Sequence, residues 1–141
     1  TTPAVWIDAS QFTQVVLSLV VNARDAIVAK GEIGLRLRLL RAAEDRPPRA
    51  PTGDWVIFQV RDSGSGMTPE VQQRIFEPYF TTKTESRGTG LGLAVVHGVV
   101  RAAGGHAVVE SEVGVGTTFW IFLPPLDASG RRPSPGGGLP A

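Results

Sequence analysis

The amino-acid sequence predicts an α+β fold in two layers, with helices on one face of a mixed, mostly antiparallel sheet. Three observations predict it. Apolar residues recur at helical spacing in residues 8–30 and 91–103, apolar and polar residues alternate as in a strand at residues 33–40, and glycines punctuate the chain between such segments. The 141 residues fit one domain, and 42% hydrophobic against 19% charged residues is a globular composition.

The first predicted helix spans residues 8–30, and a short edge strand at residues 5–7 precedes it. Asp8 or Ser10 would cap the start of the helix, and Gly31 would end it. The apolar positions that define its buried stripe are Phe12, Val15, Val16, Leu19, Val20, Ala23 and Ile27.

Two strands are predicted next. Residues 33–40 alternate between leucine or isoleucine and arginine or glycine, which predicts a half-buried strand with Ile33, Leu35, Leu37 and Leu39 on its inner face. Residues 55–61 form the second strand, with Val56, Phe58 and Val60 on one face. The proline-rich residues 42–53 between them predict a surface loop.

Two further helices and two closing strands complete the predicted fold. Residues 69–76 form a short helix with proline in its first turn, and residues 91–103 form a helix that Gly104 and Gly105 close. Residues 106–110 and 117–123 form strands joined by a turn at Gly114-Val115-Gly116. The folded domain is expected over residues 1–123, followed by a proline- and glycine-rich tail or linker over residues 124–141.

Composition excludes several classes of protein. The chain has no cysteine, which excludes a disulfide scaffold, a cysteine zinc finger and a cysteine nucleophile. A formal net charge of +1 argues against a nucleic-acid surface or a polybasic membrane surface. No apolar run approaches a membrane span, and no signal peptide is recognisable. Because the first residue is Thr1 and not methionine, we expect a piece of a longer protein.

Two glycine loops predict a nucleotide site. Asp62-Ser63-Gly64-Ser65-Gly66-Met67 follows a strand, and Gly88-Thr89-Gly90-Leu91-Gly92-Leu93 runs into a helix, whose free N–H groups suit phosphate. Alone, the first loop is better explained as a tight turn between a strand and a helix, and the second is a weak signal because many helices begin after glycine. The sequence has neither a P-loop lysine motif nor the His-Arg-Asp loop of eukaryotic-type protein kinases.

Two more segments carry polar residues in a pattern. Ser18, Asn22 and Asp25 share one stripe of the first helix, where the Asn22 amide oxygen would suit Mg²⁺, although an exposed asparagine at the edge of the stripe is the simpler alternative. Phe76 and Phe80 anchor the start of a polar segment that predicts a lid over a ligand or, alternatively, an ordinary loop.

Taken together in this order, the four segments resemble the catalytic ATP-binding domain of two-component sensor histidine kinases, a branch of the Bergerat-fold superfamily of gyrase B and the heat-shock ATPases. Leu19 to Ala26 resembles the N box, Asp62 to Met67 the G1 box, Phe76 to Lys83 the F box and Gly88 to Leu93 the G2 box. The pattern ends with Gly114-Val115-Gly116-Thr117-Thr118-Phe119. The residues Asn-Ala-Arg-Asp-Ala of the N box and Phe-Thr-Thr-Lys of the F box are most like those of nitrogen-regulator and hybrid sensor kinases.

The resemblance implies a role for each matched residue. Asp62 would accept a hydrogen bond from the adenine amino group, Asn22 would hold Mg²⁺, and Lys83 and Arg87 would neutralise charge at the γ-phosphate as catalytic cations. The implied nucleotide-binding set is Asn22, Asp25, Asp62, Gly64, Gly66, Phe80, Gly88, Thr89, Gly90, Leu91, Gly92 and Thr117.

One position departs from the superfamily pattern. Ser18 stands one turn before Asn22, where the hydrolases of the superfamily carry a glutamate that activates water and many histidine kinases carry a second asparagine. A serine cannot act as a strong general base, which favours phosphoryl transfer over hydrolysis. A non-kinase ATPase and a pseudo-kinase that only binds ATP are the alternatives.

The resemblance also implies partners and a location. The phosphoacceptor is a histidine on a separate, dimeric helical-hairpin domain, expected N-terminal to Thr1, and a response-regulator receiver domain is the next acceptor. His97 and His106 are expected to be structural or surface residues and not acceptors. The expected location is cytoplasmic, either in a cytoplasmic protein or as the cytoplasmic part of a membrane-bound sensor, with no nucleic acid bound and no direct membrane contact from this domain.

Overall fold

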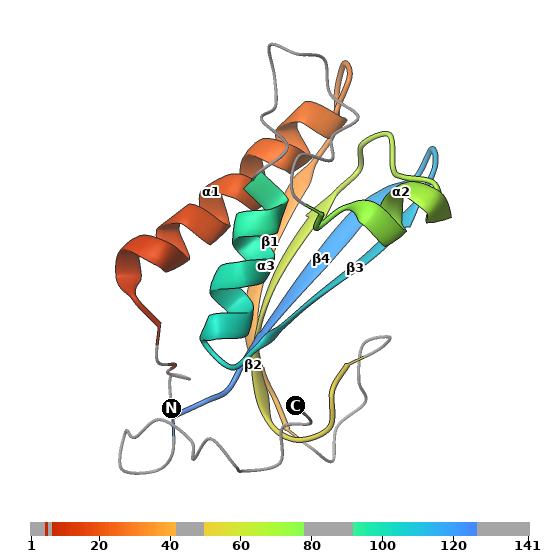
Figure 1. Ribbon diagram of the computed structural model, residues 1–141. Coiled ribbons are helices and arrows are strands. Elements are labelled where there is room, and N and C mark those ends of the chain that lie inside the picture. Colours follow the sequence, from red (N-terminus) through yellow and green to blue (C-terminus); the bar gives the residue numbers. More distant parts are fainter. Residues whose placement is uncertain (1–4, 6, 42–49, 78–91, 127–141) are drawn as a thin grey trace.

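The computed structural model describes residues 5, 7–41, 50–77 and 92–126. In chain order the elements are α1 (Ala9–Ala26), β1 (Ile33–Leu40), β2 (Trp55–Asp62), α2 (Pro69–Arg74), α3 (Gly92–Ala102), β3 (His106–Glu112) and β4 (Gly116–Leu123) (Figure 1). The predicted α+β fold is confirmed. The four strands lie in the order β1-β2-β4-β3, and all three pairings among them are antiparallel. Among the described residues, no helix is both long and apolar enough to cross a bilayer.

Helix α1 starts where predicted but ends earlier. Asp8 is its N-cap, and the Asp8 carboxylate accepts hydrogen bonds from the backbone N–H groups of Ser10 and Gln11. The prediction that the helix reaches Lys30 is wrong, because α1 ends at Ala26. The Ala26 carbonyl, which would accept an intrahelical bond in a longer helix, instead accepts the N–H of Ser65 at 2.9 Å. A tertiary contact therefore ends the helix before Gly31.

Strand β1 has the predicted bounds but not the predicted burial. Ile33, Leu35 and Leu37 are 38%, 54% and 57% exposed, so the expectation of a half-buried strand fails for its first half. The buried residues of α1, Val15, Leu19 and Ala23, pack with the side chains of β2 and β4. Because β1 is at the edge of the described sheet, its inner face extends past the helix that would cover it.

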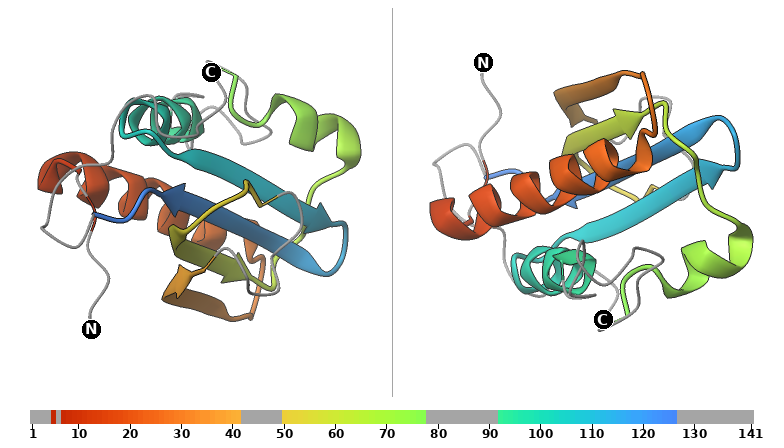
Figure 2. Two further views of the ribbon diagram at one scale, coloured as in Figure 1. Left: turned by 90° about the horizontal axis from the view of Figure 1, so that it is seen from below. Right: turned by 90° about the horizontal axis from the view of Figure 1, so that it is seen from above.

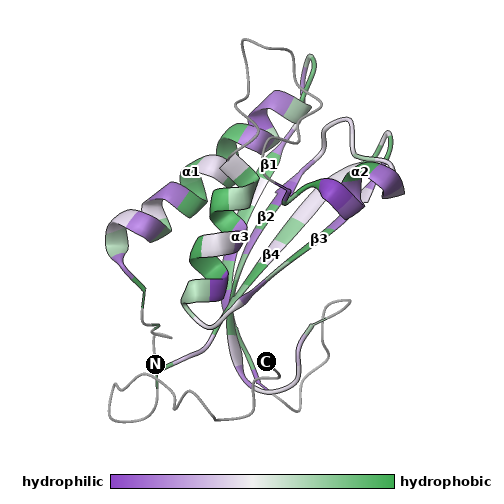
Figure 3. Ribbon diagram, in the orientation of Figure 1, coloured by the Kyte–Doolittle hydropathy of each residue, from purple (hydrophilic) through white to green (hydrophobic). Residues whose placement is uncertain are grey.

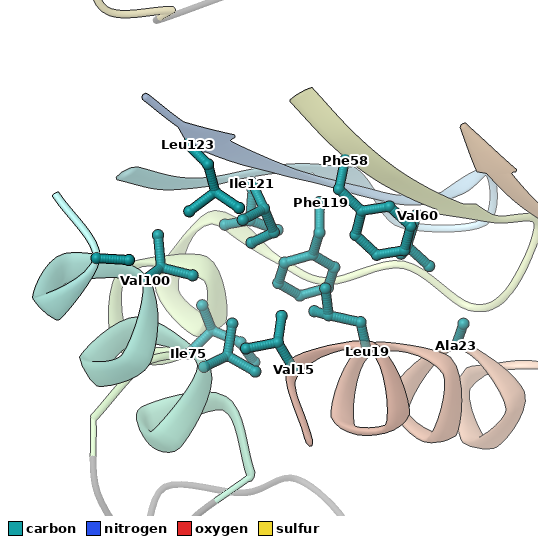
Figure 4. Close-up of a cluster of buried hydrophobic side chains, with 13 residues drawn as sticks. Val15, Leu19, Ala23, Phe58, Val60, Ile75, Val100, Phe119, Ile121 and Leu123 are labelled. Carbon is teal, nitrogen blue, oxygen red and sulfur yellow. The ribbon is translucent and has the colours of Figure 1, made fainter. Parts of the chain in front are cut away.

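The main core lies between α1, α3 and one face of the sheet. Val15, Leu19 and Ala23 of α1 and Val100 of α3 point toward Phe58 and Val60 of β2 and Phe119, Ile121 and Leu123 of β4 (Figure 4). Helix α1 crosses the strands on this face (Figure 2). The opposite face carries a second buried cluster, made of Leu40, Trp55, Ile57, Trp120 and Phe122. Strands β2 and β4 are thus apolar on both faces, which fixes them as the centre of the sheet.

The remaining elements shift by a few residues from their predicted bounds. Helix α2 is capped by Thr68 and is largely hydrophilic, whereas α3 is largely apolar (Figure 3). Gly104, with φ of 84°, ends α3, and Gly114, with φ of 82°, forms the turn between β3 and β4, both as predicted. The expected edge strand at residues 5–7 is wrong in extent, because Val5 makes only an isolated bridge to Pro125.

Candidate nucleotide-binding site

A row of polar residues crosses three strands at one end of the core. Asp62, the last residue of β2, is opposite Thr117 of β4, and Thr117 is opposite Ser111 of β3. Side chains alternate along a strand, so Asp62 is on the same face as Phe58 and Val60, and Thr117 on the same face as Phe119. Asp62 and Thr117 are each only 4% exposed. Among the residues that the structure describes, they are the only polar or charged ones that are buried as whole residues, backbone included.

Two opposing effects act on the pKa of the Asp62 carboxylate. Burial raises its pKa above the ordinary value of an aspartate, while hydrogen bonds from the backbone N–H groups of Gly64 and Thr117 lower it. The Gly64 N–H donates to Oδ1 at 2.8 Å. These two donors favour the ionised carboxylate, which keeps lone pairs free for a further donor. A buried carboxylate of this kind is suited to bind a polar ligand group that carries hydrogen.

The loop after Asp62 packs tightly on two neighbouring elements. A Cβ added at Gly64 would lie 2.6 Å from the Ala26 carbonyl oxygen, where α1 ends. Gly66, with φ of 73°, has room for no side chain, because a Cβ there would lie 2.1 Å from the Glu112 carbonyl oxygen of β3. In the described part of the chain, both glycines thus allow close approach of backbone to backbone. They hold the loop between α1 and the β3–β4 hairpin.

The polar stripe of α1 faces the start of α3. The Ser18 Oγ lies 3.9 Å from the position that a Cβ on Gly92 would take, and Gly92 is the first residue of α3. The Asp25 side chain is 4% exposed and forms an ion pair with Arg24, in which Asp25 Oδ1 lies 3.3 Å from Arg24 Nη2. Asn22 is half-buried. Its amide makes no hydrogen bond to another described residue.

That arrangement fits Mg²⁺ held by one protein ligand. Within the described ranges no group of three His, Asp or Glu side chains could hold a metal ion. Mg²⁺ bound with nucleotide keeps several waters and phosphate oxygens and needs only one or two protein ligands. The half-buried amide of Asn22, which has no hydrogen-bond partner among the described residues, is a suitable oxygen ligand.

Several predicted residues lie outside the described part of the chain. They are Phe80, Lys83, Arg87, Gly88, Thr89, Gly90 and Leu91. Phe76, where the predicted lid segment starts, is described, and its ring packs edge-on against Phe119 with centroids 6.2 Å apart. The His97 ring of α3 also packs against Phe76, with ring centroids 5.3 Å apart.

Sequence reasoning missed two polar residues beside the site. The Ser111 hydroxyl accepts the Met67 N–H at 2.7 Å, donates to the Gly116 carbonyl at 3.0 Å and contacts the Thr117 hydroxyl at 2.7 Å. The Gln72 amide of α2 donates to the carbonyls of Met67 and Ser111, both at 3.0 Å. The sequence held a usable signal for Ser111, since a tight turn centred on Gly114 pairs it with Thr117. Nothing in the sequence indicates the contact of Gln72.

Comparisons with known proteins find relatives that cover most of this chain. Residues 7–127 match the family model described as histidine kinase-, DNA gyrase B-, and HSP90-like ATPase. The sensor kinase CckA of Brucella abortus (strain 2308) is 48% identical over 122 residues, which cover 84% of this chain and 13% of that protein. The chain therefore spans about an eighth of that relative's length.

Solved structures show the same fold. The mycobacterial sensor histidine kinase MprB aligns with a TM-score of 0.71 and 27% identity, over 94% of this chain and 80% of that chain. Full-length ShkA in complex with AMPPNP aligns with a TM-score of 0.68 and 30% identity, over 88% of this chain and 23% of that chain.

Proposed function

Because the chain belongs to the histidine kinase-, DNA gyrase B- and HSP90-like ATPase family, we propose that it binds Mg-ATP and donates the γ-phosphoryl group to a histidine of a separate helical-hairpin domain. The observation that carries the proposal is the buried Asp62 carboxylate opposite Thr117. A relative of known structure, ShkA, was solved with an ATP analogue. Sensor kinases such as CckA are the relatives that share this segment.

Asp62 would select the base. Its free lone pairs accept hydrogen bonds, and adenine offers an exocyclic amine at the edge where guanine offers a carbonyl oxygen. A buried carboxylate that meets a carbonyl oxygen leaves two acceptors facing each other, which disfavours guanine strongly. Burial is the larger effect and raises the pKa of this carboxylate, and the backbone donors of Gly64 and Thr117 oppose it by favouring the ionised form.

The phosphates would lie along the stripe of α1 and the start of α3. Asn22 would hold Mg²⁺, which supplies charge neutralisation to the phosphate oxygens. The glycines Gly88, Gly90 and Gly92 would bring backbone N–H groups to the phosphates, and Lys83 and Arg87 would stabilise the charge at the γ-phosphate. Of these residues, only Asn22 and Gly92 are among those described.

The chemistry proposed is transfer to an external nucleophile. A ring nitrogen of the acceptor histidine attacks the γ-phosphorus, the bond to the β,γ-bridging oxygen breaks, and ADP leaves with the bonding electron pair. Ser18, one turn before Asn22, has a hydroxyl where a hydrolase needs a carboxylate base, which supports transfer over hydrolysis. A response-regulator receiver domain would take the phosphoryl group next.

The first test is nucleotide binding. Asp62→Asn replaces one acceptor oxygen by a donor, so we expect at least a tenfold loss of ATP affinity by calorimetry. Glu110→Gln is the matched control, because Glu110 is exposed on the other face of the sheet. Unchanged ATP affinity in Asp62→Asn would refute the assignment of the base pocket.

The second test is phosphoryl transfer. The domain is incubated with labelled ATP and the helical-hairpin domain of its own kinase, and acid-labile, base-stable phosphohistidine is expected on the hairpin domain. ATP binding without transfer would favour a pseudo-kinase, and rapid phosphate release without phosphohistidine would favour an ATPase.

A further inference from the structure

The hydroxyl of Ser111 has three hydrogen-bond partners, and their chemistry fixes where each proton lies. The backbone N–H of Met67 can only donate, and the carbonyl of Gly116 can only accept. A serine hydroxyl has one proton and two lone pairs. Ser111 therefore accepts from Met67 and gives its single proton to Gly116.

This leaves one role for Thr117. Its Oγ1 lies 2.7 Å from the Ser111 Oγ. Since the Ser111 proton is already committed, Thr117 must donate its own proton into the remaining lone pair of Ser111. The Thr117 hydroxyl then has no proton left, and only its lone pairs can meet a ligand.

Thr117 and Asp62 are buried neighbours on adjacent strands. Both would then present acceptors alone to whatever enters between them. We infer that Ser111 is a positioning residue that sets nucleotide selectivity, because it turns the Thr117 proton away from the base and so completes an acceptor-only pocket. The inference rests on the proposed binding of ATP beside Asp62.

The surroundings hold Ser111 in place for this role. The Gln72 amide donates to the backbone carbonyls of Met67 and Ser111, each at 3.0 Å, and thereby ties α2 to β3. Gln72 touches the Ser111 backbone but takes no part in the proton count of its hydroxyl. It therefore offers a control that loosens the same strand without changing the acceptor pattern.

The experiment compares ATP with inosine triphosphate, which carries a carbonyl oxygen in place of the 6-amino group. In Ser111→Ala, Thr117 regains a free proton and can donate to that oxygen. We expect the ratio of the two dissociation constants, inosine triphosphate over ATP, to fall about tenfold, the effect of one hydrogen bond. Ser111→Thr keeps the hydroxyl and should keep the ratio. Gln72→Met should change both affinities by the same factor.

A double-mutant cycle tests the route through Thr117. Thr117→Val alone should lower the ratio, and adding Ser111→Ala to it should lower the ratio no further. The inference is overturned if Ser111→Ala changes both affinities equally, or if it still lowers the ratio in the Thr117→Val background.

Two further outcomes are decisive. If Ser111→Ala does not fold, Thr117→Val carries the test, and an unchanged ratio in that variant overturns the inference. Loss of ATP affinity in Asp62→Asn together with an unchanged ratio in Ser111→Ala overturns this inference alone. ATP affinity that does not depend on Asp62 overturns the proposed function as well.

Discussion

Three glycines, two in strands and one in the turn between β3 and β4, form a graded series for substitution by alanine. Gly116, at the start of β4, has φ of 143°, and a Cβ there would lie 2.0 Å from the Asp62 carbonyl oxygen. Gly114, two residues earlier in the same hairpin, has φ of 82° and open space around the added atom. Gly34 in β1 has neither a positive φ nor a close neighbour. The series therefore separates the energetic cost of a side chain at positive φ from the cost of a steric clash between the added Cβ and a neighbouring strand.

The expected magnitudes follow from those two terms. Gly34→Ala should change the free energy of unfolding by less than about 0.5 kcal/mol. Gly114→Ala should cost about 1–2 kcal/mol, the strain of an L-residue at positive φ. Gly116→Ala adds to that strain a contact in which two strands must move apart by about 1 Å, and the total should exceed about 3 kcal/mol.

Urea unfolding followed by circular dichroism measures all three differences. ATP affinity of the folded fraction provides a second reading, since Gly116 adjoins both Thr117 and Asp62. Equal losses in Gly114→Ala and Gly116→Ala would mean that the close approach to Asp62 does not constrain the hairpin, and the reasoning would be refuted.

Two further predictions concern the two faces of the sheet. Phe119 is 1% exposed in the main core, so Phe119→Ala should cost about 3–5 kcal/mol in urea unfolding. Val115→Ala, at a 58% exposed position, should cost almost nothing, and a similar loss in both would contradict the packing. Burial and the Arg101 cation lower the pKa of His106 below 6.5, so protonation favours the unfolded chain. Stability should be complete above that pH and fall on acidification, and thermal melts of His106→Phe should show a smaller decline than the original protein.

The local pattern of the sequence predicted the elements well. The spacing of apolar residues and the placement of glycines located each helix and strand of the described residues to within a few residues, and the order of the motifs predicted the family. The largest error in bounds, the end of α1, arose because Ser65, nearly forty residues further along the chain, binds the Ala26 carbonyl. Propensities of neighbouring residues cannot predict a contact between segments so far apart in the sequence.

The parts that could not be predicted depend on the arrangement of distant segments. The alternation of apolar and polar residues showed that Leu35 and Leu37 share a face of the strand. It did not show that α1 lies over β2 and β4 instead of β1. The motif singled out Asp62, which the structure shows to be buried, and its role in binding adenine stays a prediction. The role of Ser111 depends on three distances, and these exist only once β3 pairs with β4.

The outer strand β1 has a consequence for handling the protein. Leu35 and Leu37 are exposed apolar side chains on β1, an edge strand of the described sheet, and an exposed apolar edge of that kind favours self-association of the protein. Arg36 and Arg38 alternate with them on the reverse side. In a head-to-tail encounter of two copies these guanidinium groups would face each other and repel. Concentrated salt weakens that repulsion, so dilute buffers should keep the purified domain monodisperse.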